Sequence, residues 1–194
     1  MRSAARSRET NETLIAVELN LDAAPSADIQ TGVVMLDHLL GQFAFHGRFA
    51  LRIEARSLDG IRHHVIEDVA IAVGAALDEA LAQRTGIARY GCVTLPMDDA
   101  LVRVAVDLGG RIFSRTDLAL RAERIEDLET VMIPHVIGSL AANARATLHV
   151  DRLSGEDPHH VAEAAFKALG RACAQAWQLD PSLDGVASTK GMLV

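Results

Sequence analysis

Apolar and polar residues alternate along several stretches of the chain with the period of two that is typical of half-buried β-strands. These predicted strands cover residues 14–22, 50–57, 101–110, 112–120 and 146–153. Apolar or alanine-rich stretches of helical length predict helices around residues 36–43 and 133–140 and in the segments that begin at residues 63 and 159. Turn-forming segments lie at residues 23–28, 57–60, 109–110 and 154–158. The order strands, helix, strand, helix therefore occurs twice.

The two sets of elements are copies of one unit. When the sequence is shifted against itself by 96 residues, seven of the fourteen positions from 63 to 76 carry the same residue. HHVIED at residues 63–68 then lies over HHVAEA at residues 159–164, and a shift of 97 residues places His38 over His135. The matched residues are His63 with His159, His64 with His160, Val65 with Val161, Glu67 with Glu163, Ala72 with Ala168, Gly74 with Gly170, Ala76 with Ala172 and, at the second shift, Gly41 with Gly138.

The repeat predicts an α+β fold made of two similar halves related by a pseudo-twofold axis, with sheets packed on helices. The first half covers residues 12–90 and the second covers residues 91–180, with RTGIARYG at residues 84–91 as the connector. Residues 1–11 are expected to be a disordered N-terminal segment. Residues 181–194 contain two glycines and no hydrophobic period, so we expect a loop that contributes to binding.

The composition narrows the function to small-molecule chemistry. Hydrophobic residues make up 49% of the 194 residues, enough for one compact unit whose core consists mainly of Ala, Val, Leu and Ile, since aromatics make up only 4%. A formal net charge of −7 argues against binding to nucleic acid or to an anionic membrane. With no apolar run long enough for a signal peptide or a membrane span, we expect a cytoplasmic protein. Cys92 and Cys173 are expected to be reduced, buried thiols.

The histidine motifs predict two metal ions. On a helix, residues four apart share a face, so His63 and Glu67 can hold one ion, whereas the adjacent His64 points about 100° away. Two ions, each with ligands from both repeats or from neighbouring subunits, employ every matched histidine. The predicted ligands are His38, His63, His64, Glu67, His135, His159, His160 and Glu163. Imidazole and carboxylate suit Mn, Fe, Co or Zn. His46 and His149 do not match under the repeat, so we expect structural roles for them.

The sequence resembles the imidazoleglycerol-phosphate dehydratase family from about residue 12 to its end. The resemblance lies in TGVVMLDHLLGQFAFHG, HHVIEDVAIAVGAAL, GIARYG, PMDDALVRVAVDLGGR, HVIGSLAANARATLHV, HHVAEAAFKAL and STKGMLV. It implies two halves that resemble domain 2 of ribosomal protein S5, trimers that assemble into a 24-subunit homo-oligomer, and active sites between subunits with two Mn²⁺ ions each. It also implies the dehydration of D-erythro-imidazoleglycerol phosphate to imidazole acetol phosphate in L-histidine biosynthesis.

The resemblance also implies roles for individual residues. Glu12 matches the position of a glutamate with an acid/base role, and Glu9 is its rival. His64, Glu67 and Glu163 are implied to take part in catalysis as well as in metal binding. The residues implied to bind the phosphorylated imidazole substrate are Glu12, Gln42, Arg89, Asp98, Arg111, Lys167, Ser188 and Lys190.

The sequence departs from the family pattern around the ligands. Arg62, Val65, Pro134 and Pro158 stand where the family usually has other residues, so the surroundings of the metal ligands differ. Three alternatives therefore stay open: a diverged paralogue that acts on a related compound, another dinuclear-metal enzyme such as a hydrolase, and a non-catalytic metal-binding assembly. A hydrolase would favour aspartates and a carboxylate that bridges close-set ions. A non-catalytic assembly would have lost its phosphate-binding residues.

Overall fold

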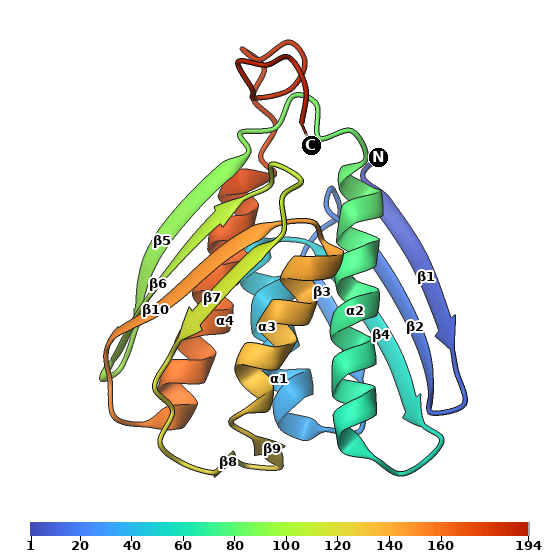
Figure 1. Ribbon diagram of the computed structural model, residues 1–194, viewed down its shortest axis with the longest axis vertical. Helices are drawn as coiled ribbons and strands as arrows, with labels where there is room; N and C mark the ends of the chain where they lie inside the picture. The colour runs from blue at the N-terminus through green and yellow to red at the C-terminus, as the bar shows by residue number, and fades with distance from the viewer. Residues whose placement is uncertain (194) are drawn as a thin grey trace.

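Four helices lie between two four-stranded sheets in the computed structural model, which describes residues 1–193 (Figure 1). The first sheet contains, in order, β1 (Ser3–Glu9), β2 (Thr13–Asn20), β4 (Ala50–Ser57) and β3 (Ser26–Gln30). The second contains β5 (Tyr90–Met97), β6 (Ala100–Asp107), β10 (Thr147–Ser154) and β7 (Phe113–Asp117). The helices are α1 (Val34–Gly47), α2 (Arg62–Leu81), α3 (Met132–Asn143) and α4 (Pro158–Ala176). A small hairpin, β8 (Arg124–Ile125) and β9 (Leu128–Glu129), precedes α3.

The predicted α+β fold and its duplication are confirmed. Both sheets have the same topology: the first three strands are antiparallel and the fourth pairs in parallel with the third. In β2 and β6 the buried and exposed positions alternate, so one face of each sheet packs on the helices. The core contains mostly Ala, Val, Leu and Ile, as the composition predicted.

Helices from different halves pack against each other. α1 packs on α4 and α2 packs on α3, so the two halves interlock. The matched glycines explain how closely they approach, because a Cβ on Gly170 would lie 2.5 Å from the Phe43 carbonyl oxygen and a Cβ on Gly74 would lie 2.7 Å from that of Leu140. No other residue fits these helix crossings without a shift of backbone.

The expectation of a disordered segment at residues 1–11 is wrong. Ser3–Glu9 form the edge strand β1, which pairs antiparallel with β2 along its whole length. Arg6 in this strand forms a 2.6 Å ion pair with Glu79 of α2. The sequence gives no strand pattern here because β1 exposes almost every side chain, so its order comes from backbone pairing and not from alternating burial.

Three smaller expectations also need correction. Residues 23–28 were expected to form a turn, but Ser26 already begins β3, whose pairing with β4 fixes it despite its polar sequence. The expected strand at residues 112–120 ends at Asp117. Cys92 is exposed, because it lies on the outer face of the edge strand β5, whereas Cys173 is buried as expected. Burial raises the pKa of the Cys173 thiol to about 12.

The connector and the tail meet at one end of the molecule, beyond the C-terminal ends of α2 and α4 (Figure 1). Arg84 in the connector is buried and donates hydrogen bonds to the carbonyls of Leu108, Ala144 and Arg145. Val194, the last residue of the predicted tail, lies outside the described residues. None of the helices within residues 1–193 has both the length and the apolar character needed to cross a membrane.

Candidate active site

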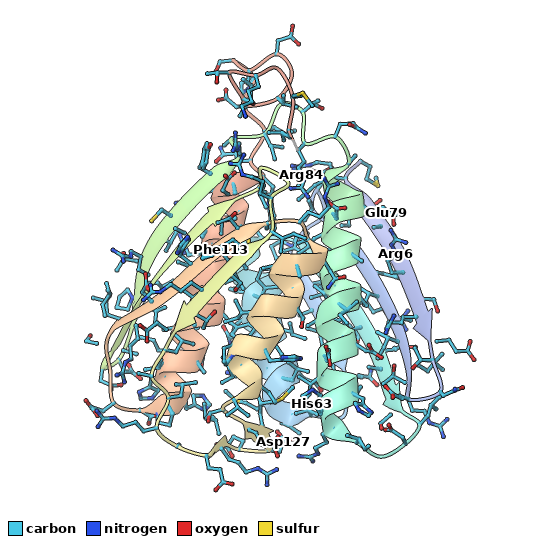
Figure 2. The ribbon with its side chains drawn as sticks, viewed as in Figure 1. Arg6, His63, Glu79, Arg84, Phe113 and Asp127 are labelled. Atoms are coloured by element: carbon cyan, nitrogen blue, oxygen red, sulfur yellow. The ribbon has the colours of Figure 1, made fainter. Side chains whose placement is uncertain are left out.

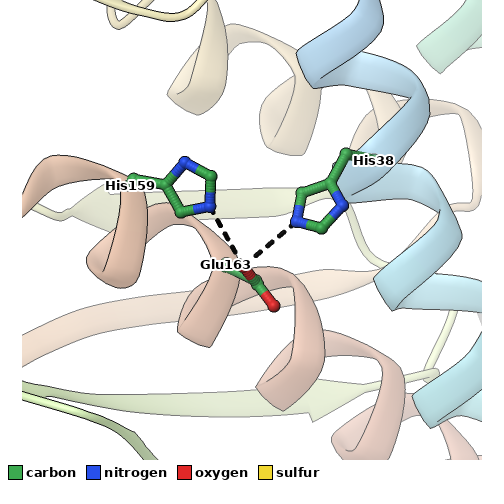
Figure 3. A group of neighbouring side chains, drawn as sticks. All are labelled: His38, His159 and Glu163. Atoms are coloured by element: carbon green, nitrogen blue, oxygen red, sulfur yellow. Dashed lines mark hydrogen bonds and ion pairs between the residues drawn. The ribbon is translucent and has the colours of Figure 1, made fainter.

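His38, His159 and Glu163 form the first metal-capable group, called the α1/α4 cluster (Figure 3). The Nε2 atoms of His38 and His159 lie 3.0 and 3.2 Å from Glu163 Oε2. Lys167 Nζ lies 2.7 Å from the other carboxylate oxygen, Oε1. Although burial favours the neutral acid, the hydrogen bonds from Lys167 and His38 outweigh it and hold the pKa of Glu163 at about 2. The carboxylate is therefore ionised and ready to bind a cation.

His63, Glu67 and His135 form the second group, called the α2/α3 cluster. Glu67 Oε2 lies 3.5 Å from His63 Nε2, and Glu67 Oε1 lies 3.4 Å from His135 Nε2. His135 Nε2 is buried and has no hydrogen-bond partner among the described residues. A buried nitrogen without a partner is costly, and a bound metal ion would satisfy it.

Each cluster takes its ligands from both halves. His38 of the first half joins His159 and Glu163 of the second, and His135 of the second half joins His63 and Glu67 of the first, because α1 packs on α4 and α2 packs on α3. The donor atoms within each cluster all lie within 4.8 Å of one another. Two imidazoles and one carboxylate in each group fit a divalent transition metal, so the donor chemistry agrees with the predicted metal sites.

The adjacent histidines, His64 and His160, point away from both clusters. Each ring lies at 88° to the ring of the histidine before it. His64 Nδ1 lies 2.6 Å from Asp59 Oδ2, and His160 Nδ1 lies 2.7 Å from Asp99 Oδ1. These carboxylates raise the pKa of both imidazoles. Within one described chain, therefore, six of the eight predicted ligands form the α1/α4 and α2/α3 clusters, and these two do not join them.

Glu12 lies at the tip of the β1–β2 hairpin and faces His64, with Oε2 3.5 Å from Nδ1. Buried Asp68 of α2 anchors this hairpin, because it accepts hydrogen bonds from the Arg8 guanidinium at 2.8 Å and from the Thr13 hydroxyl. Together with Asp59, Glu12 and His64 form a third group of donors within 4.8 Å. The rival Glu9 ends β1, three residues before Glu12.

The tip of the β5–β6 hairpin occupies the matching place in the second half. Asp98 Oδ2 lies 3.4 Å from His160 Nε2. Asp99 accepts hydrogen bonds from the backbone N–H groups of Glu156 at 2.6 Å and Asp157 at 3.1 Å. These bonds, together with His160, lower the pKa of Asp99. The sequence indicated Asp98 but gave no signal for Asp59, Asp68 or Asp99.

Four of the eight residues implied to bind the substrate line one pocket of about 540 Å³, called the tail pocket. They are Arg89, Arg111, Ser188 and Lys190. Asp107 binds Arg89 Nε at 2.7 Å and Nη2 at 3.0 Å, and the carbonyl of Ala187 accepts from Arg89 Nη1 at 2.7 Å. Arg89 therefore holds the tail against β6, while Arg111 and Lys190 are more exposed cations facing the same space.

Two predicted substrate residues lie elsewhere. Lys167 is in α4 beside Glu163, with Nζ also 3.4 Å from Met97 Sδ, so it belongs to the surroundings of the α1/α4 cluster. Gln42 lies one turn after His38 on α1 and is half-buried. His149 stacks on Phe113 with ring centroids 5.2 Å apart, in the second sheet and outside both clusters.

The β8–β9 hairpin contacts the helix ends that carry both metal-capable clusters, a contact that the sequence did not reveal. The Asp127 carboxylate accepts hydrogen bonds from the backbone N–H groups of Val34 and Met35, both at 2.9 Å, and so caps α1 one turn before His38. Arg62, which directly precedes His63, donates to the Asp127 carbonyl at 2.7 Å. Figure 2 shows Asp127 and His63 near the same end of the molecule, opposite the tail.

The departures from the family pattern fit the local structure. Val65 is buried in the core. Pro158 begins α4, and the Asp157 carboxylate caps that helix by accepting from the His159 and His160 N–H groups. Pro134 lies in the first turn of α3, where a missing N–H costs no helical hydrogen bond. None of these residues displaces a ligand within the described clusters.

Comparison with known proteins agrees with this arrangement. The family model for imidazoleglycerol-phosphate dehydratase matches residues 31–173. The chain is 45% identical over 194 residues to the imidazoleglycerol-phosphate dehydratase of Thermoanaerobacter pseudethanolicus, covering 100% of both chains, and 45% identical over 193 residues to that of Caldivirga maquilingensis, covering 99% of both.

Two solved structures are also similar. The crystal structure of the dehydratase from Staphylococcus aureus has a TM-score of 0.83 and 33% identity, and covers 91% of this chain and 99% of that one. The Pyrococcus furiosus enzyme in complex with (S)-C348 has a TM-score of 0.84 and 38% identity, and covers 97% and 100%. With the motifs, the duplicated fold and the full-length similarity in agreement, the chain belongs to the imidazoleglycerol-phosphate dehydratase family, whose members are hydro-lyases of histidine biosynthesis.

Proposed function

We propose that the protein is a cytoplasmic dinuclear-metal lyase that dehydrates D-erythro-imidazoleglycerol phosphate to imidazole acetol phosphate, in active sites shared between subunits. The observation that carries this proposal is the presence of two His–His–Glu clusters, each assembled across the two halves. A single cluster would support a structural ion. Two clusters of the same composition match a substrate whose imidazole ring has two nitrogens.

The α1/α4 and α2/α3 clusters would each hold one Mn²⁺ ion, with His64 and His160 of neighbouring subunits as further ligands. When bound, such ions act as Lewis acids that favour the deprotonated ring, whose electron density promotes loss of the hydroxyl group. His135 Nε2 supports this assignment, because it is buried without a hydrogen-bond partner among the described residues. The ionised Glu163, held at Oε1 by Lys167, supports it for the other cluster.

Glu12 is the proposed acid/base residue. The reaction breaks the C3–O bond of the substrate, removes the neighbouring carbon-bound proton and releases water. The substrate therefore needs a nearby proton acceptor, and the enol that forms needs a proton donor to carbon when it ketonises. Glu12 is exposed at a hairpin tip that buried Asp68 anchors, and it lies within 3.5 Å of His64. A carboxylate in that position can accept the proton and return it when the enol ketonises.

The tail pocket is proposed to bind the substrate phosphate. Arg111 and Lys190 supply positive charge and Ser188 supplies a hydroxyl donor, in a protein of net charge −7. Arg89 is occupied by Asp107 and Ala187, so its main contribution is to hold the tail in place. Lys167 and Gln42 lie near the α1/α4 cluster and are proposed to contact the rest of the substrate.

The distance between these parts supports an active site made by several subunits. α2 has 20 residues, and its N-terminal end carries the metal ligands while the tail lies beyond its C-terminal end (Figures 1 and 2). A helix of that length spans about 30 Å, several times the length of a small phosphorylated substrate. The tail pocket of one subunit must therefore serve the clusters of another. Val34 and Val131, each 73% exposed at the metal-bearing ends of α1 and α3, suit burial at such an interface.

The alternatives receive less support. A hydrolase with a bridging carboxylate would need a residue common to both clusters, and the two metal-capable clusters share none among the described residues. A non-catalytic assembly has no need for the tail pocket, which retains its cations. A diverged paralogue would keep both clusters but act on a related compound, so only the choice of substrate separates it from the proposed enzyme.

The test is a direct assay of the full chain with Mn²⁺ and imidazoleglycerol phosphate. We expect imidazole acetol phosphate to form, chelation to abolish turnover, and added Mn²⁺ to restore it. Growth of a histidine auxotroph that lacks the dehydratase would exclude the paralogue. A metal-loaded protein that leaves the substrate unchanged and fails to support growth would refute the proposal.

Sedimentation of the same samples tests the shared site. Because ligands from neighbouring subunits would make the ions part of the interface, we expect the 24-subunit assembly of trimers to dissociate to trimers without metal and to reform with Mn²⁺. An unchanged large particle after complete metal removal would contradict interfacial ions.

A further inference from the structure

His64 and His160 have the same unexplained contact. In each case an aspartate carboxylate lies within hydrogen-bond distance of Nδ1: Asp59 at 2.6 Å from His64, and Asp99 at 2.7 Å from His160. These contacts lie outside the α1/α4 and α2/α3 clusters. They leave the other ring nitrogen, Nε2, free of any aspartate at these short distances.

The repeat does not account for the two contacts, because the carboxylates come from different places. Asp59 lies in the loop between β4 and α2, and Gly155 occupies the matching position in the second half. Asp99 lies at the tip of the β5–β6 hairpin. The shortest contact to Nδ1 of the matched histidine therefore comes from a different loop in each half, while Glu12 at the first hairpin tip lies farther away, 3.5 Å from His64 Nδ1. Because the two carboxylates are not matched by the repeat, the shared contact indicates that the histidine itself requires a carboxylate at Nδ1.

Neighbouring loop residues hold both carboxylates in position through hydrogen bonds from backbone N–H groups and, for Asp59, from a serine hydroxyl. Asp59 accepts a hydrogen bond from the N–H of Ile61 at 2.9 Å and from the Ser57 hydroxyl at 3.1 Å. Asp99 accepts from the N–H of Glu156 at 2.6 Å and from that of Asp157. Their direction is thus set by the loops, independently of the imidazoles.

The chemistry of this contact determines the histidine tautomer. An ionised carboxylate can only accept a hydrogen bond, so Nδ1 must carry the proton. A neutral imidazole protonated at Nδ1 has its lone pair at Nε2, which is the form that coordinates a metal through Nε2. In His160 that atom is 3.4 Å from the exposed Asp98, a weaker contact that an ion could replace.

We propose that Asp59 and Asp99 are positioning residues that fix the Nδ1–H tautomer and the ring direction of His64 and His160, so that Nε2 is presented to a metal ion held by a cluster of a neighbouring subunit. This inference rests on the proposed function, since it assumes interfacial metal sites. The competing explanation is that Glu12, Asp59 and His64 themselves hold a third ion, because their donor atoms lie within 4.8 Å.

The test is a titration of the metal-free full-length protein with Mn²⁺, followed by electron paramagnetic resonance and by metal analysis. Asp59→Ala and Asp99→Ala remove the acceptor and should weaken Mn²⁺ binding by about 10- to 100-fold, the usual effect of losing such a partner. Asp59→Asn and Asp99→Asn keep a carbonyl oxygen that accepts from Nδ1–H, so their loss should stay below about tenfold. Glu156→Ala controls for the loss of one exposed negative charge.

A double-mutant cycle identifies the histidine as the route of the effect. In a His64→Ala background, Asp59→Ala should cause no further loss of Mn²⁺ affinity. Urea unfolding of the metal-free variants confirms that each is folded. Wild-type affinity in Asp59→Ala, an equal loss in the Asn and Ala variants, an additive loss in the double mutant, or a third ion per subunit that disappears with Asp59 would each overturn the inference. A wild-type protein that binds no Mn²⁺ would instead refute the proposed function.

Discussion

The two halves carry the same set of predicted metal ligands but hold their hairpin tips differently. In the first half, buried Asp68 binds Arg8 and Thr13 on either side of the tip that bears Glu12. In the second half, position 164, which matches Asp68, is a buried alanine. Its hairpin tip is tied instead through Asp99 to the loop before α4. The first tip is thus held by the buried Asp68, called the internal anchor, and the second by the exposed Asp99.

The surroundings of the two glutamate ligands also differ. Glu163 is buried and paired with Lys167, whereas Glu67 is half-exposed and position 71, which matches Lys167, is an isoleucine. The comparison shows that the two copies of the unit kept the same histidines and glutamates while the residues around them diverged. We expect the two halves to contribute equally to metal binding and unequally to proton transfer.

The largest expected effect is a loss of kcat from a substitution at one of the two hairpin tips. Glu12→Gln should lower kcat by about 10²- to 10⁴-fold with metal content unchanged, because it removes the proposed proton-transfer group. Asp98→Asn at the other tip should lower kcat by less than about tenfold, since its proposed role is substrate binding. Steady-state kinetics and metal analysis on both variants test the difference. Equal losses at the two tips would show that proton transfer is not confined to Glu12.

The next largest effect is a loss of stability when Asp68, the internal anchor, is replaced. Asp68→Ala leaves the buried Thr13 hydroxyl without its acceptor and releases Arg8, so the free energy of unfolding should fall by about 2–3 kcal/mol. Asp157→Ala in the second half removes a helix cap and should cost about 1 kcal/mol. Urea unfolding of the metal-free protein measures both. A loss at Asp68 no larger than that at Asp157 would mean that the first tip has no special anchor.

Substitutions at the two helix crossings should lower the free energy of unfolding by similar amounts, in contrast to substitutions at the two hairpin tips. Gly74→Ala and Gly170→Ala each force a Cβ against a backbone carbonyl and should cost about 1–3 kcal/mol. Gly41→Ala is the matched control, because its Cβ would meet no atom within 4 Å in the described part of the chain, and it should stabilise α1 by about 0.5–1 kcal/mol. Thermal unfolding compares the three. A large cost at only one crossing would show that the helix pairs are not equivalent.

The smallest effect is a shift in acid stability. The pKa of Glu163 is lowered to about 2, so its contribution to stability is present above the unfolded pKa of about 4.3 and is lost as the pH falls toward 2. Lys167→Met removes the main cation and makes this cluster resemble the α2/α3 cluster, so acid unfolding of the metal-free protein should begin roughly half a pH unit higher. Glu67→Gln serves as the control, and it should leave the acid midpoint nearly unchanged because Glu67 lacks a lysine partner.

The sequence predicted the features that repeat and missed those that occur once. The matched histidines, glutamates and helix glycines revealed the duplication, the helix order and six predicted ligands that meet in the structure. The sequence did not predict β1, because backbone pairing with β2 orders this strand and its exposed side chains show no hydrophobic period. Asp59, Asp68, Asp99 and Asp127 each make contacts that occur in only one half, so the sequence offered no second copy to compare.

Asp127 is an example of a long-range contact that no sequence pattern predicts. Its carboxylate caps α1 from a position 92 residues away along the chain, and its hairpin has no counterpart in the first half. Neither its spacing nor its neighbours distinguish it from any exposed aspartate. Only the packing of the two halves brings it to the helix end.

Because helices pack across the two halves, the two clusters become complete at different times while the ribosome synthesises the chain. All three donors of the α2/α3 cluster are present once His135 has been translated. The α1/α4 cluster must wait for Glu163, which lies 125 residues after His38. Domains generally fold from the N-terminus during translation, so the nascent chain can complete one ligand set well before the other. Until α4 emerges, α1 carries His38 and an apolar surface without its partner helix, which makes this interval the stage at which the growing chain is most exposed to misassembly.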